Sequence, residues 1–240
     1  MSVTTRIQEL NNRLATNLVS KGVSAEGTET TTELINKVND IESGGTSVIN
    51  PEWTDWRYFS YYDNRNDLVA KLKYSDTANG TNFSSMFYAC SLLTTIPQLD
   101  TSNGTNFGAM FNGCSALTSI LQLSTSNGTN FNGMFSGCRA LTTIPLLNMS
   151  NVSGASWSNM FYNCTALENV TFEGTIPVRG NMSVFSSCPN LTVDSLMSFI
   201  NALTNMSDTA TYTITIGSTN LAKLTEEQIQ IATDKRITLQ

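Results

Sequence analysis

The stretch Phe107-Gly-Ala-Met-Phe-Asn-Gly-Cys-Ser-Ala-Leu-Thr-Ser-Ile120 decides the fold, because the same phrase returns along the chain. Copies begin at Phe83 and Phe131 with Met, Phe, Cys, Leu and Ile at the same offsets, and weaker copies follow. The chain has five cysteines, one for each copy: Cys90, Cys114, Cys138, Cys164 and Cys188. Each unit is only as long as the interval between two successive cysteines. A unit this short cannot bury its own apolar side, so it must stack on its neighbours. The sequence therefore predicts a repeat solenoid with a continuous core.

Each unit is expected to contain one short helix and one parallel strand. Phe107, Phe111 and Cys114 fall at i, i+4 and i+7, the spacing of one helix face, and residues 117–120 then enter a strand. Asn-Gly pairs at 79–80, 103–104 and 127–128 are expected to supply the positive φ that a sharp turn between units demands.

The five cysteines are expected to be free thiols buried in the core. They are an odd number, and all fall at one position of the repeat. Equivalent cysteines of adjacent coils would nevertheless lie near enough for a bridge, so geometry leaves a disulfide open.

Residues 1–41 are predicted to form two helices that attach or oligomerise the chain. Apolar residues recur at coiled-coil spacing in the first helix and along one face of the second, which begins at a capping box over 30–33. Helices this short are marginal alone, so we expect them to pack against further copies of the chain, as a trimer, or against a larger assembly. Packing back onto the repeats is the alternative. The apolar positions are Val3, Ile7, Leu10, Leu14, Leu34, Val38 and Ile41.

Residues 42–50 are predicted to be a flexible linker, and residues 51–68 an aromatic cap on the first coil. Six aromatic residues fall within 53–62, and large aromatic side chains cover an open coil efficiently. An exposed cluster would instead offer a platform for sugar rings. Its candidate ligand contacts are Trp53, Trp56, Tyr58, Tyr61 and Tyr62.

Repeats are expected over 69–191, and two longer helix-strand units over 192–240 are expected to close the array. Asp194 is predicted to cap the first of these helices. Residues 212–216 are predicted to be a strand, 225–228 a capping box that starts a second helix, and 237–239 a final strand.

The phrase Met-Phe-x-x-Cys-x-x-Leu-x-x-Ile, preceded by Asp100-Thr-Ser-Asn-Gly-Thr-Asn, resembles the BspA-type leucine-rich repeats of bacterial surface proteins and phage tail appendages. The resemblance covers roughly residues 69–191. The opening stretch, chiefly in the runs 14–23 and 30–41, resembles N-terminal segments of tail proteins of phages and prophages that infect Gram-positive bacteria. The resemblance of the repeats implies an α/β repeat solenoid, which is a leucine-rich-repeat-like right-handed coil. It also implies an adhesive or structural role without shared catalytic residues.

Composition argues against catalysis and against several kinds of partner. The chain has no histidine, the commonest general base and transition-metal ligand, and no cofactor or metal is expected. A net charge of −6 argues against nucleic acid, and no apolar stretch fits a membrane span or secretory signal. We expect a protein made in the host cytoplasm and located in the virion, bound to other virion proteins through residues 1–41.

The sequence leaves two main functions open. The chain is either a non-enzymatic phage appendage, of the tail fibre or baseplate type, that attaches to a host-surface saccharide or protein, or a purely structural decoration or fibre protein of the tail or capsid. A bacterial surface adhesin is a third possibility. For an attachment protein, rows of neutral polar side chains are the expected contacts: Thr101, Asn103, Thr105, Asn106, Thr125, Asn127, Thr129 and Asn130.

Overall fold

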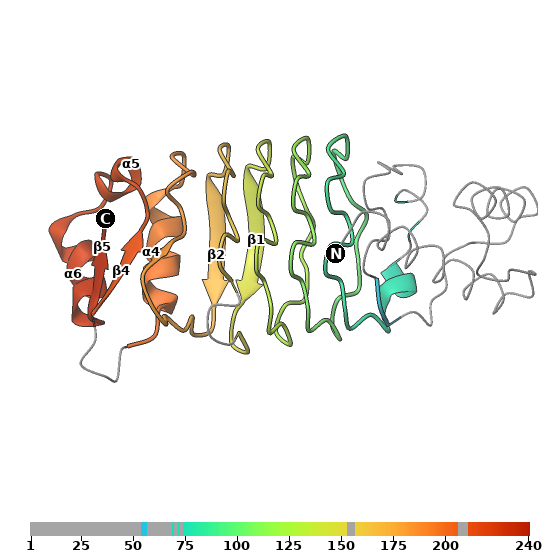
Figure 1. The fold of residues 1–240 in the computed structure, drawn as a ribbon, viewed down its shortest axis with the longest axis horizontal. Coiled ribbons are helices and arrows are strands. Elements are labelled where there is room, and N and C mark those ends of the chain that lie inside the picture. The colour runs from blue at the N-terminus through green and yellow to red at the C-terminus, as the bar shows by residue number, and fades with distance from the viewer. Residues whose placement is uncertain (1–53, 57–68, 70–71, 73, 153–156, 206–210) are drawn as a thin grey trace, which may run out of the picture. The chain divides into compact units, whose positions relative to one another are not determined.

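The structure is a computed structural model. Coils stacked side by side make up most of it (Figure 1). It describes residues 54–56, 69, 72, 74–152, 157–205 and 211–240. The chain divides into two units, Met1–Pro51 and Glu52–Gln240, and all of the described residues belong to the second. The predicted N-terminal helices and linker lie outside the described residues.

The repeated phrase forms the core of the coils, as predicted. Its phenylalanines build two columns of stacked rings, and neighbouring ring centroids in the first three coils lie 5.4 to 5.7 Å apart. The first column contains Phe83, Phe107 and Phe131, and the second contains Phe87, Phe111, Phe135, Phe161 and Phe185. All of these rings are buried. The result is a repeat solenoid-like fold whose core passes from coil to coil.

The predicted short helix of each repeat is wrong, because the backbone reverses its twist twice within the phrase. Residues 108–113 form consecutive turns, and within them Ala109 has a φ of 54° and Gly113 a φ of 80°. A right-handed helix excludes positive φ. The equivalent residues of the other coils are also left-handed: Ser85, Ala89, Gly133, Gly137, Asn159 and Asn163.

The direction of the N–H groups alternates along these turns. The N–H of Met110 donates within its own coil to the carbonyl of Phe107, whereas the N–H of Phe111 donates to the carbonyl of Met134 in the next coil. The same bond to the next coil, at 2.7 to 2.9 Å, is made by the N–H groups of residues 107, 109 and 113. Neighbouring coils therefore take the bonds that a helix would make internally, and the side chains still fall inward at the predicted positions.

Parallel strands occur on another side of the coils, but in fewer coils than predicted. β1 (Thr143–Asn148) pairs with β2 (Asn169–Glu173), and in the coil before β1 the strand is reduced to a single bridge from Ser119. The register shifts between Ile144 and Leu147. Pro145, which lies inside this shift, has no N–H to donate, so the ladder is interrupted there.

The Asn-Gly turns keep glycine for a different reason from the one predicted. The glycines at 80, 104 and 128 do not have a positive φ. A Cβ atom on Gly104 would collide with the ring of Phe107, and the same holds for the other two glycines and the ring three residues later. Glycine is required here so that the turn can lie against the phenylalanine column.

Beyond the coils, helices and strands close the structure largely as predicted. The described elements are η1 (Tyr74–Thr77), β3 (Met182–Ser183), α4 (Val193–Ala202), β4 (Tyr212–Thr215), α5 (Ser218–Leu221), α6 (Glu226–Asp234) and β5 (Ile237–Leu239). β3, β4 and β5 form a parallel sheet, and the predicted capping box of Thr225 and Gln228 is confirmed. The residue that caps α4 is Thr192, not the predicted Asp194.

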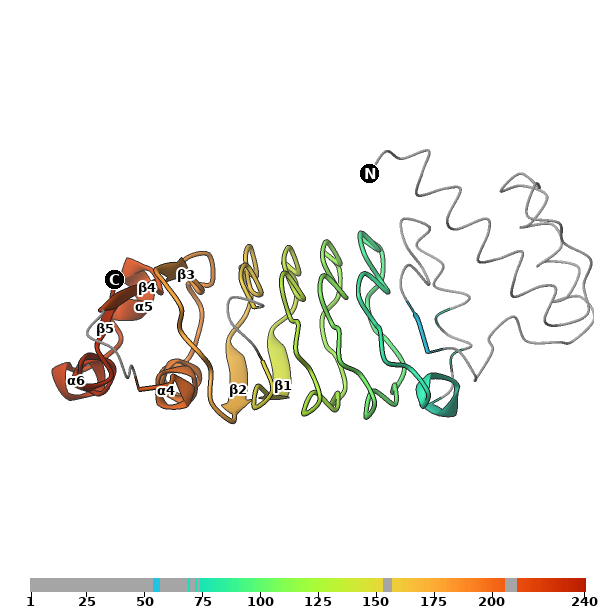
Figure 2. The same ribbon diagram turned by 60° about the horizontal axis from the view of Figure 1, so that its bottom comes forward.

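Helix α4 takes the place of a strand beside β2 (Figure 2). Two of its hydroxyl groups accept the outward N–H groups of β2: Ser195 from Val170 at 3.0 Å, and Ser198 from Phe172 at 2.8 Å. An open strand edge invites pairing with another chain. The serines of α4 therefore satisfy the edge at which the coils end.

Candidate ligand-binding recess

Most of the polar side chains predicted to contact a ligand bind the neighbouring coil instead. The amides of Asn103 and Asn127 donate to backbone carbonyls of the preceding coil at 2.8 and 2.7 Å. The hydroxyls of Thr105 and Thr129 do the same at 3.1 Å each. These four side chains are exposed, but their donor groups already bind the coil beneath them.

Two of the predicted contacts are wrong because they are buried. Thr101 and Thr125 are 1% and 2% exposed. The hydroxyl of Thr101 donates to the carbonyl of Ser124, and that of Thr125 accepts from the N–H of Asn148. Both side chains join coils from the inside and offer no surface to a ligand.

The remaining pair, Asn106 and Asn130, bind each other. The Nδ2 of Asn130 donates to the Oδ1 of Asn106 at 3.0 Å, and this oxygen also accepts from the N–H of Gly108. The two amides therefore form a ladder along the coils, which leaves them less able to bind a ligand.

Trp56, a candidate of the aromatic platform, is 1% exposed and part of the core. Its N–H donates to the carbonyl of Asn82 in the first coil, so its ring serves the cap and not a platform. The other candidates of that cluster, Trp53, Tyr58, Tyr61 and Tyr62, lie outside the described residues. So do the predicted oligomerisation residues Val3, Ile7, Leu10, Leu14, Leu34, Val38 and Ile41.

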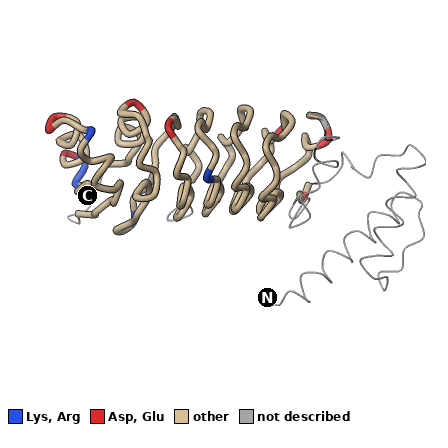
Figure 3. The backbone as a smooth tube through the Cα atoms, turned by 90° about the horizontal axis from the view of Figure 1, so that it is seen from above, with Lys and Arg blue, Asp and Glu red and all other residues tan. Residues whose placement is uncertain are grey.

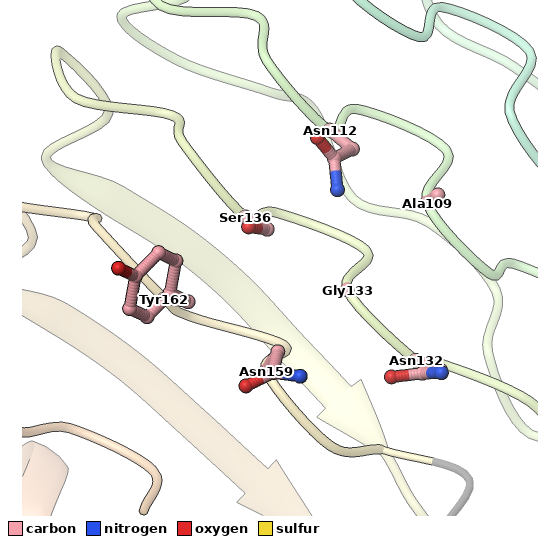
Figure 4. A pocket seen from close by; sticks show the side chains of 7 residues that line it. All are labelled: Ala109, Asn112, Asn132, Gly133, Ser136, Asn159 and Tyr162. Carbon is pink, nitrogen blue, oxygen red and sulfur yellow. The ribbon is translucent and has the colours of Figure 1, made fainter.

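A surface recess of about 400 Å³ lies over the turns of three successive coils (Figure 4). Its lining residues come from the left-handed turns and the positions beside them: Ala109, Asn112, Asn132, Gly133, Ser136, Asn159 and Tyr162. The hollow exists because Ala109 and Gly133 carry little or no side chain at positions where the fourth coil has Asn159. The ring of Tyr162, 55% exposed, stands at one end.

Among the described residues, the polar side chains of this recess have no hydrogen-bond partner, unlike those of the Thr and Asn ladders. Within the described part of the chain, no hydrogen bond joins the side chains of Asn112, Asn132, Ser136, Asn159 or Tyr162 to another protein group. Their amides and hydroxyls can therefore donate to and accept from a bound molecule.

The recess is also uncharged. None of the described lining residues is Asp, Glu, Lys or Arg, and Asp100 and Arg139 are the sole charged residues of the sequence between Thr77 and Leu167. The colouring of Figure 3 shows how few charges the coils carry. Recognition in the recess would thus rest on neutral hydrogen bonds and on the tyrosine ring.

Sequence reasoning missed the recess, although a signal was present. Most positions of the phrase hold the same residue in successive coils, but the position before the second left-handed residue reads Tyr88, Asn112, Ser136 and Tyr162. Variation inside a regular repeat marks positions that stacking does not dictate.

Two family models match the chain. Residues 57–173 match a family described as a Mycoplasma protein of unknown function, DUF285, and residues 132–230 match the BspA type leucine-rich repeat region in six copies. These matches support a BspA-like leucine-rich repeat protein. No curated protein and no solved structure matches the chain. The resemblance of the BspA-like repeats seen in the sequence is confirmed, and the phage tail context stays a prediction.

The cysteines of the repeats are free and buried, as predicted. Burial raises the pKa of Cys138 to about 12, and burial also raises the pKa of Cys114. A hydrogen bond with Cys188, together with burial, raises the pKa of Cys164. Because the thiolate is the nucleophile, the raised pKa values of Cys114, Cys138 and Cys164 make these three thiols unreactive core residues at neutral pH.

Among the described residues, no group of His, Cys, Asp or Glu side chains is arranged to hold a metal ion. None of the helices described is both long and apolar enough to span a membrane.

Proposed function

We propose that this chain is a non-enzymatic, adhesin-like protein that attaches to a host surface through a right-handed repeat solenoid. The match of residues 132–230 to the BspA type repeat region supports an adhesin-like role. We place the contact in the recess over coils two to four. We further propose that residues 1–41 form a trimer. They would also attach the chain to other virion proteins of a phage tail or baseplate.

One observation carries the binding role. Along the coils, Thr and Asn side chains are used to join one coil to the next, whereas the side chains of the recess have no partner within the described chain. Stacking alone gives no reason to expose Tyr162 beside three amides that have no partner among the described residues. A ligand that accepts and donates hydrogen bonds would explain this arrangement.

A purely structural decoration or fibre protein is the second candidate. The ladders favour it, since nearly every predicted contact of the polar face, from Thr101 to Asn130, stiffens the stack. A spacer of this kind needs no ligand at all.

Attachment to cells distinguishes the two functions. The full chain, labelled with a fluorophore, is incubated with Gram-positive bacteria and with cultured epithelial cells, and bound fluorescence is counted. The wild type is compared with the double variant Asn132→Ala, Tyr162→Ala and with Tyr74→Ala, which removes an equally exposed tyrosine outside the recess. Attachment that the double variant loses and Tyr74→Ala keeps supports the proposal. Absence of attachment, or equal attachment by all three proteins, supports the structural role.

A further inference from the structure

We infer that the recess binds a neutral saccharide, with the ring of Tyr162 as the platform on which a sugar ring stacks. The inference rests on the proposed function and names the chemistry of its ligand. Three properties of the recess lead to it: its donor and acceptor groups, its aromatic ring and its lack of charge.

The polar groups of the recess match hydroxyl groups. A sugar hydroxyl donates one hydrogen bond and accepts others, and an asparagine amide does both through its oxygen and nitrogen. Asn112, Asn132 and Asn159 come from three successive coils and face the same hollow, together with the hydroxyl of Ser136 (Figure 4). Amides set at the regular spacing of the coils can follow a row of hydroxyls along a chain of sugars.

The tyrosine supplies the apolar half of the contact. The ring of Tyr162 is 55% exposed although it stands among polar residues. Aromatic side chains with one polar end give a large, rigid contact area, and Tyr, Ser, Gly and Asn together are the composition of adaptable binding surfaces. The C–H face of a sugar ring is apolar and lies flat on such a ring, while its hydroxyls point sideways to the amides.

The lack of charge excludes acidic ligands. Phosphates, sulfates and carboxylates are held by arginine or lysine, and the lining of the recess contains neither. A neutral saccharide needs no counter-charge.

The size of the recess fits a short oligosaccharide better than a protein surface. Its volume of about 400 Å³ lies within the range of small-molecule sites, roughly 300 to 1,000 Å³. It spans two steps between coils, about 10 Å at the usual spacing of hydrogen-bonded strands. A stable protein interface buries about 800 Å² on each partner around several large anchors, and Tyr162 is the one large aromatic residue among the described residues of the lining.

Ligand-observed saturation-transfer NMR on the full chain tests the inference. The probes are cellotetraose, maltotetraose and chitotetraose, with a heparin tetrasaccharide as the charged probe. At least one neutral probe is expected to bind and the heparin probe is not. Because stacking on the ring contributes much of a weak affinity, Tyr162→Ala should lower the affinity about tenfold. Tyr162→Phe, which keeps the ring, should lower it about threefold or less.

Tyr74→Ala is the matched control and should leave the affinity unchanged. The inference is wrong if no neutral probe binds, if the heparin probe binds more tightly, or if Tyr74→Ala weakens binding as much as Tyr162→Ala. Cell attachment that depends on Tyr162 without binding of any saccharide would point to a protein ligand, so the inference would fail while the proposed function stands. Absence of both would overturn both.

Discussion

The thiol of Cys138 donates a hydrogen bond to the backbone carbonyl of Phe111 in the preceding coil, across 3.1 Å. The same bond joins Cys114 to Phe87, Cys164 to Phe135 and Cys188 to Phe161, at 3.0 to 3.2 Å. Each of these carbonyls also accepts the N–H of the cysteine in its own coil, as Phe111 does from Cys114 at 3.0 Å, so the thiol adds a second hydrogen bond that comes from the next coil. A hydrogen bond of this kind contributes at most about 0.5 to 1.5 kcal/mol to stability, and it links neighbouring coils in a way that an alanine could not.

The buried thiols should make stability depend on alkaline pH. Burial raises the pKa of Cys138 from its ordinary value of 9.0 to about 12. The unfolded chain therefore loses this proton first, and the free energy of unfolding should be constant below pH 9 and fall between 9 and 12. Urea unfolding from about pH 7 to 10.5 measures the fall. Cys138→Ala should be less stable at pH 7 but should lose less with rising pH. Equal slopes for the two proteins would contradict this account.

The phenylalanine columns should dominate the stability of the coils. Phe111 is buried and stacks between Phe87 and Phe135, with ring centroids 5.4 and 5.5 Å away. Phe111→Ala leaves a cavity inside the stack and should lower the free energy of unfolding by about 3 to 5 kcal/mol. Leu121→Ala, at a side chain 51% exposed, should change it by less than about 0.5 kcal/mol. Denaturant unfolding measures both, and a loss below about 1 kcal/mol for Phe111→Ala would rule out the stacked core.

The sequence predicted which residues are buried, because burial depends on the period, and the period is visible. It did not predict how the backbone achieves this. Spacings of four and three residues at Phe107, Phe111 and Cys114 fit a helix face, but they fit equally well a series of turns that contains two left-handed residues. Glycine at 113, 133 and 137 favoured the turns with left-handed residues over a helix. These turns, however, need carbonyls of the next coil to accept their N–H groups, and a local sequence pattern does not contain that partner.

The polar side chains predicted to contact a ligand bond between coils instead, and the sequence could not predict this for a related reason. A side chain such as Thr105 is polar and exposed, so a sequence reads it as available, but its hydroxyl bonds to Thr81, which lies 24 residues earlier. Contacts between coils use up donors that composition counts as free. At the C-terminal end, by contrast, capping boxes and strands are local signals, and there the predicted elements hold.

The glycine of the Asn-Gly turn should be intolerant of a methyl group. A Cβ atom on Gly104 would overlap the ring of Phe107 and approach Phe83 to 3.0 Å, so Gly104→Ala must displace the aromatic column. Overpacking of this kind should cost about 1 to 3 kcal/mol. Gly108→Ala is the control, since the nearest atom there is the side-chain nitrogen of Asn130, whose movement would cost its hydrogen bond to Asn106 but would leave the aromatic column in place. Thermal unfolding of the two variants should show the larger loss for Gly104→Ala, and equal losses would mean that the turn needs glycine for its backbone instead.

The end of the coils depends on one buried amide. Asn220, 1% exposed and located in α5, directs its Nδ2 at the carbonyls of Cys188 and Ile216, 3.0 and 2.9 Å away. Its Oδ1 accepts from Lys223 at 3.1 Å. The amide therefore ties the last cysteine-containing coil to the closing segment.

Asn220→Ala removes the amide donor from the carbonyl of Ile216 and leaves the carbonyl of Cys188 with the N–H of Leu191, 3.5 Å away, so it should lower the free energy of unfolding by about 2 kcal/mol. Asn201→Ala provides the comparison, because Asn201 is exposed in α4 and alanine suits a helix at least as well, so its change should stay within about 0.5 kcal/mol. Hydrogen exchange adds a local measurement. In Asn220→Ala, the N–H groups of 214–217 and 237–240 should exchange faster, while those of the phenylalanine coils keep their protection. Uniform acceleration throughout the described coils would show instead that the amide stabilises the whole stack.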